Sequence, residues 1–270
     1  MKLSSGCLLA LILFLLPALA AYGQDPERPK ATPEESFAFA LVNAEKWQSQ
    51  AMLNVGIFYE QGHGVARNFT KALEWYQKAA DAGEAEAYMR VGLCYEIGIG
   101  AAADMGKALA GFEKAAGLGH APALLKLAEV YLHGRGAAKD ENKGLALLTK
   151  AAEAGEAAAM FDLGWIILNG LFGRPAEADK ARLWFLKSAE AGHAEGILAI
   201  ANMRREGQGG RVDPEGALRW FLTAQKAGLK AQGLEEAIAE LKKKLPAQQA
   251  DAAEKAADAW LAARAAGLKN

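Results

Sequence analysis

One segment of this chain recurs five times, and this recurrence limits its fold more than any other feature. Residues 62–85 read GHGVARNFTKALEWYQKAADAGEA, and related segments start at residues 98, 134, 170 and 207. Successive copies are 36, 36, 36 and 37 residues apart when aligned on one small residue in each, here called the anchor (Gly56, Gly92, Ala128, Gly164 and Ala201). A repeat of this length buries its apolar face only by stacking on neighbouring copies. The chain is therefore expected to extend along one axis by adding units.

Each copy carries the pattern of two helices. Around the anchor, apolar residues recur with a period near 3.6 for about a dozen residues, which predicts a first helix, helix A. A glycine follows at one fixed offset, where the end of a helix needs left-handed backbone (Gly62, Gly98, Gly134, Gly170 and Gly207). Four copies then place a residue that can cap the start of a second helix, helix B (Asn68, Asp104, Asp140 and Asp213).

The second copy shows the fullest set of recurring residues: Leu93, Tyr95, Gly98, Gly100, Asp104, Lys107-Ala108 and Gly119-His120-Ala121. This combination resembles the Sel-one-like repeat, a longer relative of the tetratricopeptide repeat, over about residues 47–228. The resemblance implies an all-α fold, a right-handed α-solenoid of antiparallel helix pairs with about five full repeats and capping helices. It also implies a protein that binds and organises other proteins. The fifth copy departs most, since Arg204 replaces the helix-A tyrosine and Gly216 replaces the helix-B lysine.

The N-terminus is typical of a secretory signal peptide. Lys2 precedes an apolar run at residues 8–22, which is short for a membrane span and ends in small residues. We expect residues 1–23 to be a signal peptide cleaved near residues 20–23, with an uncleaved anchor helix as the alternative. After cleavage no transmembrane segment is expected, and the protein is predicted to be periplasmic or secreted.

The rest of the chain is predicted to consist of a linker, capping helices and the repeats. Residues 24–32 form the linker, and residues 33–46 form an N-terminal capping helix that opens with a capping box and an N1 proline at Thr32-Pro33-Glu34-Glu35. Five repeats fill residues 47–228. C-terminal capping helices fill residues 229–270 and are expected to break at Leu245-Pro246.

Charge and cysteine content argue against several kinds of function. The formal net charge is −1 and no long basic tract occurs, so no nucleic-acid partner is expected. One of the two cysteines, Cys7, lies in the predicted signal peptide, so the mature chain cannot form an internal disulfide. The other, Cys94, occupies an apolar repeat position and is expected to be a buried, inert thiol.

The sequence contains no recognisable motif for catalysis or for a cofactor. No serine begins an S-x-x-K or lies in a G-x-S-x-G motif, and no local group of Cys, His and Asp residues has the spacing of metal ligands. His120 and His193 share a repeat position with Glu84 and Glu156, which predicts a solvent-facing turn residue at this position. We therefore expect no enzyme activity, no metal and no cofactor.

Positions at which the copies differ are the candidates for partner binding, because the shared positions explain stability. The positions two before, one after and five after each anchor lie on one face of helix A, since they are three and four residues apart. In tetratricopeptide-type solenoids helix A lines the concave side, so the resemblance implies that this face is a groove. We call the fifteen positions the helix-A stripe: Asn54, Ile57, Gln61, Arg90, Leu93, Ile97, Lys126, Glu129, His133, Asp162, Trp165, Asn169, Ala199, Asn202 and Glu206. The partner-binding candidates among them are Asn54, Arg90, Leu93, Ile97, Lys126, Glu129, His133, Asp162, Trp165 and Asn169.

Together these patterns predict an exported scaffold or adaptor that binds a partner protein or peptide in the cell envelope. The residues singled out within the stripe are Arg90, Lys126, Asp162 and Trp165, since arginine and tryptophan are enriched among binding hot spots. The alternative for any one of them is an ordinary solvated side chain, whereas for the stripe as a whole a binding groove is the favoured interpretation. Two other functions stay open. One is a penicillin-recognising, β-lactamase-like envelope enzyme, a description given to some cysteine-rich relatives whose paired cysteines this chain lacks. The other is a peptidoglycan-binding module.

Overall fold

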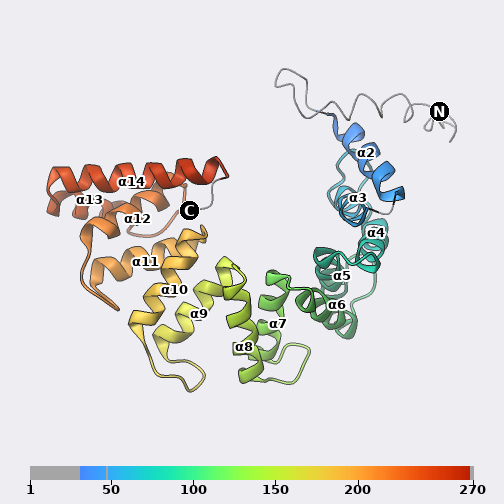
Figure 1. The fold of residues 1–270 in the computed structure, drawn as a ribbon, viewed down its shortest axis with the longest axis horizontal. Helices are drawn as coiled ribbons and strands as arrows, with labels where there is room; N and C mark the ends of the chain where they lie inside the picture. The colour runs from blue at the N-terminus through green and yellow to red at the C-terminus, as the bar shows by residue number, and fades with distance from the viewer. Residues whose placement is uncertain (1–30, 47, 268–270) are drawn as a thin grey trace. The chain divides into compact units, whose positions relative to one another are not determined.

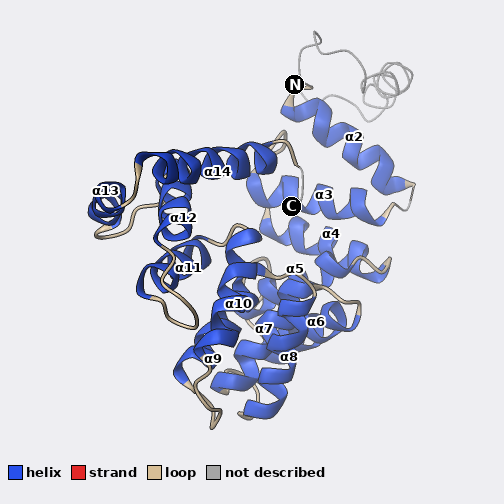
Figure 2. Cartoon of the chain, turned by 60° about the vertical axis from the view of Figure 1, so that its left-hand side comes forward, coloured by secondary structure: helices blue, strands red, loops and turns tan. Residues whose placement is uncertain are grey.

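The computed structural model describes residues 31–46 and 48–267, and every element of regular structure in them is a helix (Figures 1 and 2). The predicted signal peptide and residues 24–30 of the predicted linker lie outside the described residues. The helices are α2 (Pro33–Glu45), α3 (Ser49–Gln61), α4 (Phe69–Asp81), α5 (Ala85–Ile97), α6 (Met105–Gly117), α7 (Ala121–His133), α8 (Glu141–Glu153), α9 (Ala157–Asn169), α10 (Ala178–Glu190), α11 (Ala194–Glu206), α12 (Pro214–Lys226), α13 (Leu234–Lys244) and α14 (Ala247–Ala265). The expected all-α fold is confirmed.

Each repeat contributes one helix A and one helix B. The five helices A are α3, α5, α7, α9 and α11, and the five helices B are α4, α6, α8, α10 and α12. Every one of these ten helices has 13 residues. The equal lengths show that the sequence repeat is also a structural repeat.

The described residues form two compact units, one up to Ala115 and the other from Ala116. In the first unit, α3 packs on both α2 and α4, and α4 also packs on α5. In the second unit, the helices from α7 to α12 each pack on the next along the chain, and α12 contacts both α13 and α14. Apolar side chains buried between these successive helices form the core of each unit.

The expected helix ends are confirmed. The five glycines that follow helix A all have positive φ, between +60° and +79°, and each is the C-cap of its helix (Gly62, Gly98, Gly134, Gly170 and Gly207). At the start of helix B, the side chains of the four expected caps accept a backbone N–H at 2.9–3.0 Å (Asn68, Asp104, Asp140 and Asp213). These bonds satisfy helix-terminal groups that would otherwise lack partners.

The anchor is small because a large side chain of helix B lies against it. A Cβ atom added at Gly56 would lie 2.5 Å from the ring of Tyr76, and one added at Gly92 would lie 2.5 Å from the ring of Phe112. The corresponding helix-B residues are at most 3% exposed in all five repeats (Tyr76, Phe112, Leu148, Phe185 and Phe221). This contact joins helix A to helix B within each repeat.

A second glycine in the turn joins one repeat to the preceding one. Gly100 has φ +78°, and a Cβ atom at this position would lie 2.4 Å from the backbone carbonyl oxygen of Phe69, the first residue of α4. Gly64 approaches the carbonyl of Pro33, the first residue of α2, in the same way. The helix α2 therefore occupies the position of a helix B ahead of the first repeat. It begins with the expected capping box between Thr32 and Glu35.

The two unusual residues of the fifth repeat compensate for each other. In the first three repeats a lysine ammonium near the start of helix B lies over a helix-A tyrosine ring, at 5.4, 5.0 and 3.8 Å (Lys71–Tyr59, Lys107–Tyr95 and Lys143–Tyr131). In the fifth repeat Arg204 takes the tyrosine position and forms an ion pair with the cap residue Asp213. A side chain at Gly216 would meet this guanidinium, because a Cβ atom there would lie 2.3 Å from Arg204 Nη1. The fifth repeat therefore also has a cation between its two helices, but helix A supplies it in place of helix B.

The repeat position shared by glutamate and histidine is the N-cap of helix A, which the sequence did not indicate (Glu84, His120, Glu156 and His193). His120 and His193 are half-buried, so the expectation of solvent-facing residues is wrong for both. His193 Nδ1 accepts from the backbone N–H of Gly196 at 3.4 Å. His193 is the one member of this set whose side chain caps its helix, since Glu84, His120 and Glu156 make no side-chain cap hydrogen bond.

The C-terminal helices continue the packing of the second unit. The expected break at Leu245-Pro246 is confirmed, since α13 ends at Lys244 and α14 begins at Ala247. The rings of Trp220 in α12 and Trp260 in α14 meet edge to face, 5.8 Å apart. This contact covers the apolar side of the last helix B, which no further repeat covers among the described residues.

Candidate functional site

Three residues of the helix-A stripe border a hollow in the first unit. Arg90, Leu93 and Ile97 share one face of α5 because they are three and four residues apart. The hollow has a volume of about 140 Å³, and the rest of its wall comes from α3, α4, the turn after α5 and one more residue of α5 itself (Glu60, Phe69, Ala72, Tyr76, Ile99 and Cys94). We call this space the α5 hollow.

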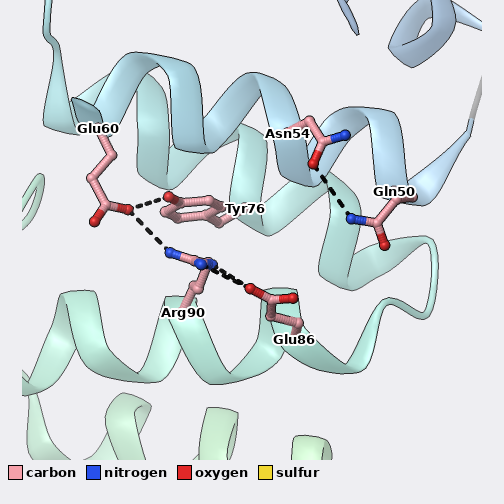
Figure 3. Close-up of polar contacts among 6 residues, drawn as sticks. All are labelled: Gln50, Asn54, Glu60, Tyr76, Glu86 and Arg90. Carbon is pink, nitrogen blue, oxygen red and sulfur yellow. Dashed lines mark hydrogen bonds and ion pairs between the residues drawn. The ribbon is translucent and has the colours of Figure 1, made fainter. Parts of the chain in front are cut away.

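One wall of the α5 hollow is a polar network (Figure 3). The Nε and Nη2 atoms of Arg90 donate to Glu86 Oε1 at 2.9 and 2.8 Å, and Arg90 Nη1 lies 3.5 Å from Glu60 Oε2. The hydroxyl of Tyr76 donates to the same Glu60 carboxylate. The guanidinium of Arg90 also lies 5.5 Å from the centre of the Tyr76 ring. Three consecutive helices therefore hold Arg90 in a single orientation.

Burial and neighbouring charges shift the pKa values of Tyr76 and Arg90 in this wall. Burial raises the pKa of Tyr76, and its hydrogen bond to Glu60 raises it further, so the phenol stays neutral at any physiological pH. Burial alone would lower the pKa of Arg90, but Glu86, Tyr76 and Glu60 together raise it above its ordinary value. The network thus contains two carboxylates and one guanidinium, and its formal charge is negative.

The other side of the hollow is apolar. Leu93, Phe69 and Ile99 are partly exposed to the space, and Ile97 at the rim is 64% exposed. Cys94 also lines it and is half-buried, so the expected full burial is wrong. Burial nevertheless raises the pKa of the Cys94 thiol to about 11, and the nearby Glu60 carboxylate adds to the shift. The thiol is therefore protonated at neutral pH and is a poor nucleophile, as expected.

The size and lining of the hollow suit one apolar side chain. An apolar cavity of about 150 Å³ in another protein holds a benzene-sized group, and the α5 hollow is of similar volume at about 140 Å³. A guest side chain would contact Leu93 and Phe69, while the polar wall would face the backbone or the next residue of the guest. No acid, base and nucleophile arrangement for catalysis is evident among the residues that line this space.

A different set of stripe residues comes together in the second unit. Asp162 in α9 lies near enough to interact electrostatically with Glu129 and His133, both in α7, and with His193 before α11. Trp165, one turn further along α9, is 51% exposed and stacks on Phe161 with ring centres 6.5 Å apart. Lys126 Nζ lies 4.0 Å from Glu129 Oε2, and Asn169 donates to the carbonyl of Trp165 at 2.8 Å.

In the first and fifth copies of the stripe, the asparagines form hydrogen bonds within their own helices. Asn54 accepts a hydrogen bond from Gln50 of its own helix at 3.4 Å (Figure 3). Asn202 donates to the carbonyl of Leu198 at 3.0 Å, again within one helix. The structure therefore divides the ten candidates into an α5 group, a group on α7 and α9, and an isolated Asn54.

Sequence analysis missed the partners of Arg90. Glu60, Tyr76 and Glu86 all lie outside the helix-A stripe, although they hold its arginine in place. Glu86 could have been found, because a glutamate four residues before an arginine is a stabilising pair on a helix. Glu60 could not, since its pairing with Arg90 depends on how α3 and α5 stack.

Among residues 31–46 and 48–267, no group of three or more His, Cys, Asp and Glu side chains is placed to hold a metal ion. In the same residues, no helix combines the length and the apolar character needed to cross a bilayer.

The described architecture is that of an all-α repeat protein, in which one helix pair is used five times with a different stripe each time. The Sel1 repeat matches the chain five times in succession, at residues 49–84, 85–120, 121–156, 157–193 and 194–229. The chain belongs to the Sel1-repeat family, the family that the sequence motif resembles.

Comparison with known proteins gives the same fold. The chain is similar to the solved structure of a Sel1 repeat protein from Oxalobacter formigenes, with 26% sequence identity, a TM-score of 0.63 and coverage of 93% of this chain and 94% of that one. A stretch of 58 residues is 38% identical to the ERAD-associated E3 ubiquitin-protein ligase component HRD3A of Arabidopsis thaliana. That match takes in 21% of this chain and 9% of the plant protein. The α-solenoid of stacked helix pairs predicted from the repeats is therefore confirmed.

Proposed function

We propose that the protein is an exported scaffold that binds a partner protein or peptide in the cell envelope through the helix-A stripe. Sel1-repeat proteins generally mediate protein–protein interactions, and this coarse function holds for the family as a whole. Export rests on the predicted signal peptide at residues 1–23. The observation that carries the choice of surface is the α5 hollow, which contains three of the ten stripe candidates.

Several features of the α5 hollow support partner binding. It has an apolar side and a polar wall, the combination that anchors one side chain of a partner and satisfies the polar groups beside it. Arg90 is already fixed by Glu86 and Glu60, so little side-chain entropy is lost when a partner docks against it. Ile97 is left 64% exposed at the rim, where a partner would cover it. The hollow accordingly acts as a preorganised receptor for one apolar side chain.

Site-specific photo-crosslinking in cells tests this surface. A photoreactive amino acid at Ile97 in the full chain should capture a discrete partner polypeptide. The matched control is the same substitution at Leu183, which is 61% exposed against 64% for Ile97 but lies on helix α10 outside the stripe. Adding Leu93→Asp should reduce capture from Ile97, because it places a charge on the apolar side. Equal capture from both positions, or none from Ile97, would overturn the proposed surface.

The two other functions left open by the sequence stay predictions with direct assays. A β-lactamase-like enzyme would turn over nitrocefin as purified protein. A peptidoglycan-binding module would be retained on insoluble peptidoglycan, and substitutions in the stripe would not reduce that retention.

A further inference from the structure

A second part of the helix-A stripe has the chemistry to recognise a cation. Asp162 and Trp165 are three residues apart on α9 and so share a face. Trp165 is 51% exposed, an unusually open position for a residue that is highly buried on average. The ring of Phe161, one turn earlier on the same helix, stacks on the Trp165 ring, and the two planes are inclined by 21°. The tryptophan is thus held in place and still presents a large part of its surface to solvent.

Within residues 31–46 and 48–267, no ion pair is formed by the carboxylate beside this ring. Among the described residues, Asp162 makes no hydrogen bond and no ion pair, although it is half-buried. Burial and the negative charge of Glu129 raise its pKa, whereas His193 and His133 lower it. Lys126 is on the neighbouring helix A, but its ammonium is 4.0 Å from Glu129. His193 in turn lies 3.4 Å from Glu195.

The arrangement differs from an ordinary acidic surface. Exposed carboxylates are normally solvated or paired at little energetic consequence. Here a carboxylate is partly removed from water beside a second carboxylate and an open indole ring. A guanidinium can stack flat on an indole and donate to a carboxylate at its edge with its fixed fork of N–H groups. One arginine would therefore satisfy both the charge and the ring.

We propose that Trp165 and Asp162, with Glu129 alongside, form a subsite for one arginine side chain of a partner polypeptide. This inference deepens the proposed function, because it gives the chemistry of a second contact on the same stripe. The subsite lies within the second unit and uses no residue of the α5 hollow. Its partner segment carries positive charge, whereas the α5 hollow takes an apolar side chain.

The test uses the full chain labelled with 5-fluorotryptophan and two short synthetic peptides. The peptides are identical except that one contains arginine and the other contains citrulline, the uncharged isostere of arginine. The chain has six tryptophans, and the Trp165→Phe variant identifies the Trp165 signal in the fluorine NMR spectrum. We expect the Trp165 signal to move saturably with the arginine peptide and to stay in place with the citrulline peptide.

Substitutions then test whether the Asp162 carboxylate recognises the arginine. Asp162→Asn should weaken the arginine-peptide affinity by about threefold to tenfold, the range for loss of one partly exposed charge contact. Glu235→Gln, which removes an exposed carboxylate on α13, should leave the affinity unchanged. An equal response to the citrulline peptide, no response to either peptide, or an unchanged affinity in Asp162→Asn would each overturn the subsite.

The outcomes separate this inference from the proposed function. If no partner is captured from Ile97 but the arginine peptide still binds, the α5 hollow is rejected as the partner surface and the subsite stands. Partner capture from Ile97 with no movement of the Trp165 signal would do the reverse.

Discussion

The second and fourth repeats place opposite chemistry on equivalent positions of the same helix. Two positions before the anchor stand Arg90 and Asp162, and one position after it stand Leu93 and Trp165. In the second repeat the charge is paired within the protein, and an apolar hollow opens beside it. In the fourth repeat the charge is unpaired among the described residues, and the aromatic ring is exposed. One backbone frame thus carries two surfaces of different kinds.

The difference shows which positions of this repeat determine its binding specificity. Anchors, turn glycines and helix caps are shared, and they determine that each copy folds and stacks. The stripe can vary because none of its positions is an anchor, a turn glycine or a helix cap. Each repeat can therefore be adjusted for a partner without changing the frame that supports it.

The largest expected effect comes from the second turn glycine of the second repeat, Gly100, when it is compared with its equivalent in the fourth repeat, Gly173. Gly100→Ala should destabilise the fold by about 2–5 kcal/mol, since it adds a clash with the Phe69 carbonyl to the strain of positive φ. Gly173 also has positive φ, +70°, but a Cβ atom there meets nothing within 4 Å. Gly173→Ala should therefore lose only about 1–2 kcal/mol. Urea unfolding of both variants measures the difference.

Equal losses in these two glycine variants would show that Gly100 does not join repeats. The frame would then depend on the left-handed backbone alone.

A smaller loss is expected from the paired charge of the second repeat. Arg90→Met should destabilise the protein by roughly 1–2 kcal/mol, because Glu60 and Glu86 keep their negative charges without the guanidinium. Combining it with Glu86→Gln should recover part of the loss, since one unpaired carboxylate is removed. Thermal unfolding of the single and double variants measures this coupling. If the two losses simply add, Arg90 does not depend on Glu86.

The smallest effect, and the one of opposite sign, is expected from the unpaired charge of the fourth repeat. The pKa of Asp162 is raised in the folded state, so its charged form destabilises the fold at neutral pH. Asp162→Asn should accordingly leave Tm unchanged or raise it by about 1–3 °C at pH 7. The advantage should shrink as pH falls through the raised pKa, because the native carboxyl is then protonated and uncharged as well.

Glu235→Gln is the control for that measurement, since its exposed carboxylate should show no comparable trend. A lower Tm for Asp162→Asn at pH 7 would mean that Asp162 stabilises the fold, and the contrast with Arg90 would disappear.

The frame could be predicted from the sequence because its determinants are local. Turn glycines, cap residues and the capping box at Thr32 act within a few residues, and the structure confirms each of them. The face of helix A that carries Arg90, Leu93 and Ile97 follows from helical spacing alone. Local pattern therefore accounts for the elements and their order.

The chemistry of the stripe could not be predicted in the same way. The contact between Arg90 and Glu60 joins residues of different repeats, so it depends on the stacking of α3 and α5. The half-burial of Cys94 depends on the hollow that this stacking leaves. Whether Asp162 finds a counterion is likewise decided by neighbouring repeats. The sequence indicates which residues share one face of a helix, whereas packing decides which of them already have partners within the protein.

The joint between repeats has a consequence for how such a chain can change in length. At Gly64, Gly100 and Gly209 the glycine lies against the backbone carbonyl of the residue that opens an earlier helix. That residue is proline at the first joint, phenylalanine at the second and alanine at the third, so the contact does not depend on which side chain is present. Some side-chain contacts, such as that of Tyr59 with Lys71, form within one copy, whereas that of Arg90 with Glu60 joins two copies. Duplication or deletion of a whole copy between two such joints would therefore keep the backbone contact at the glycine, and it would change only side-chain contacts between copies such as that of Arg90 with Glu60.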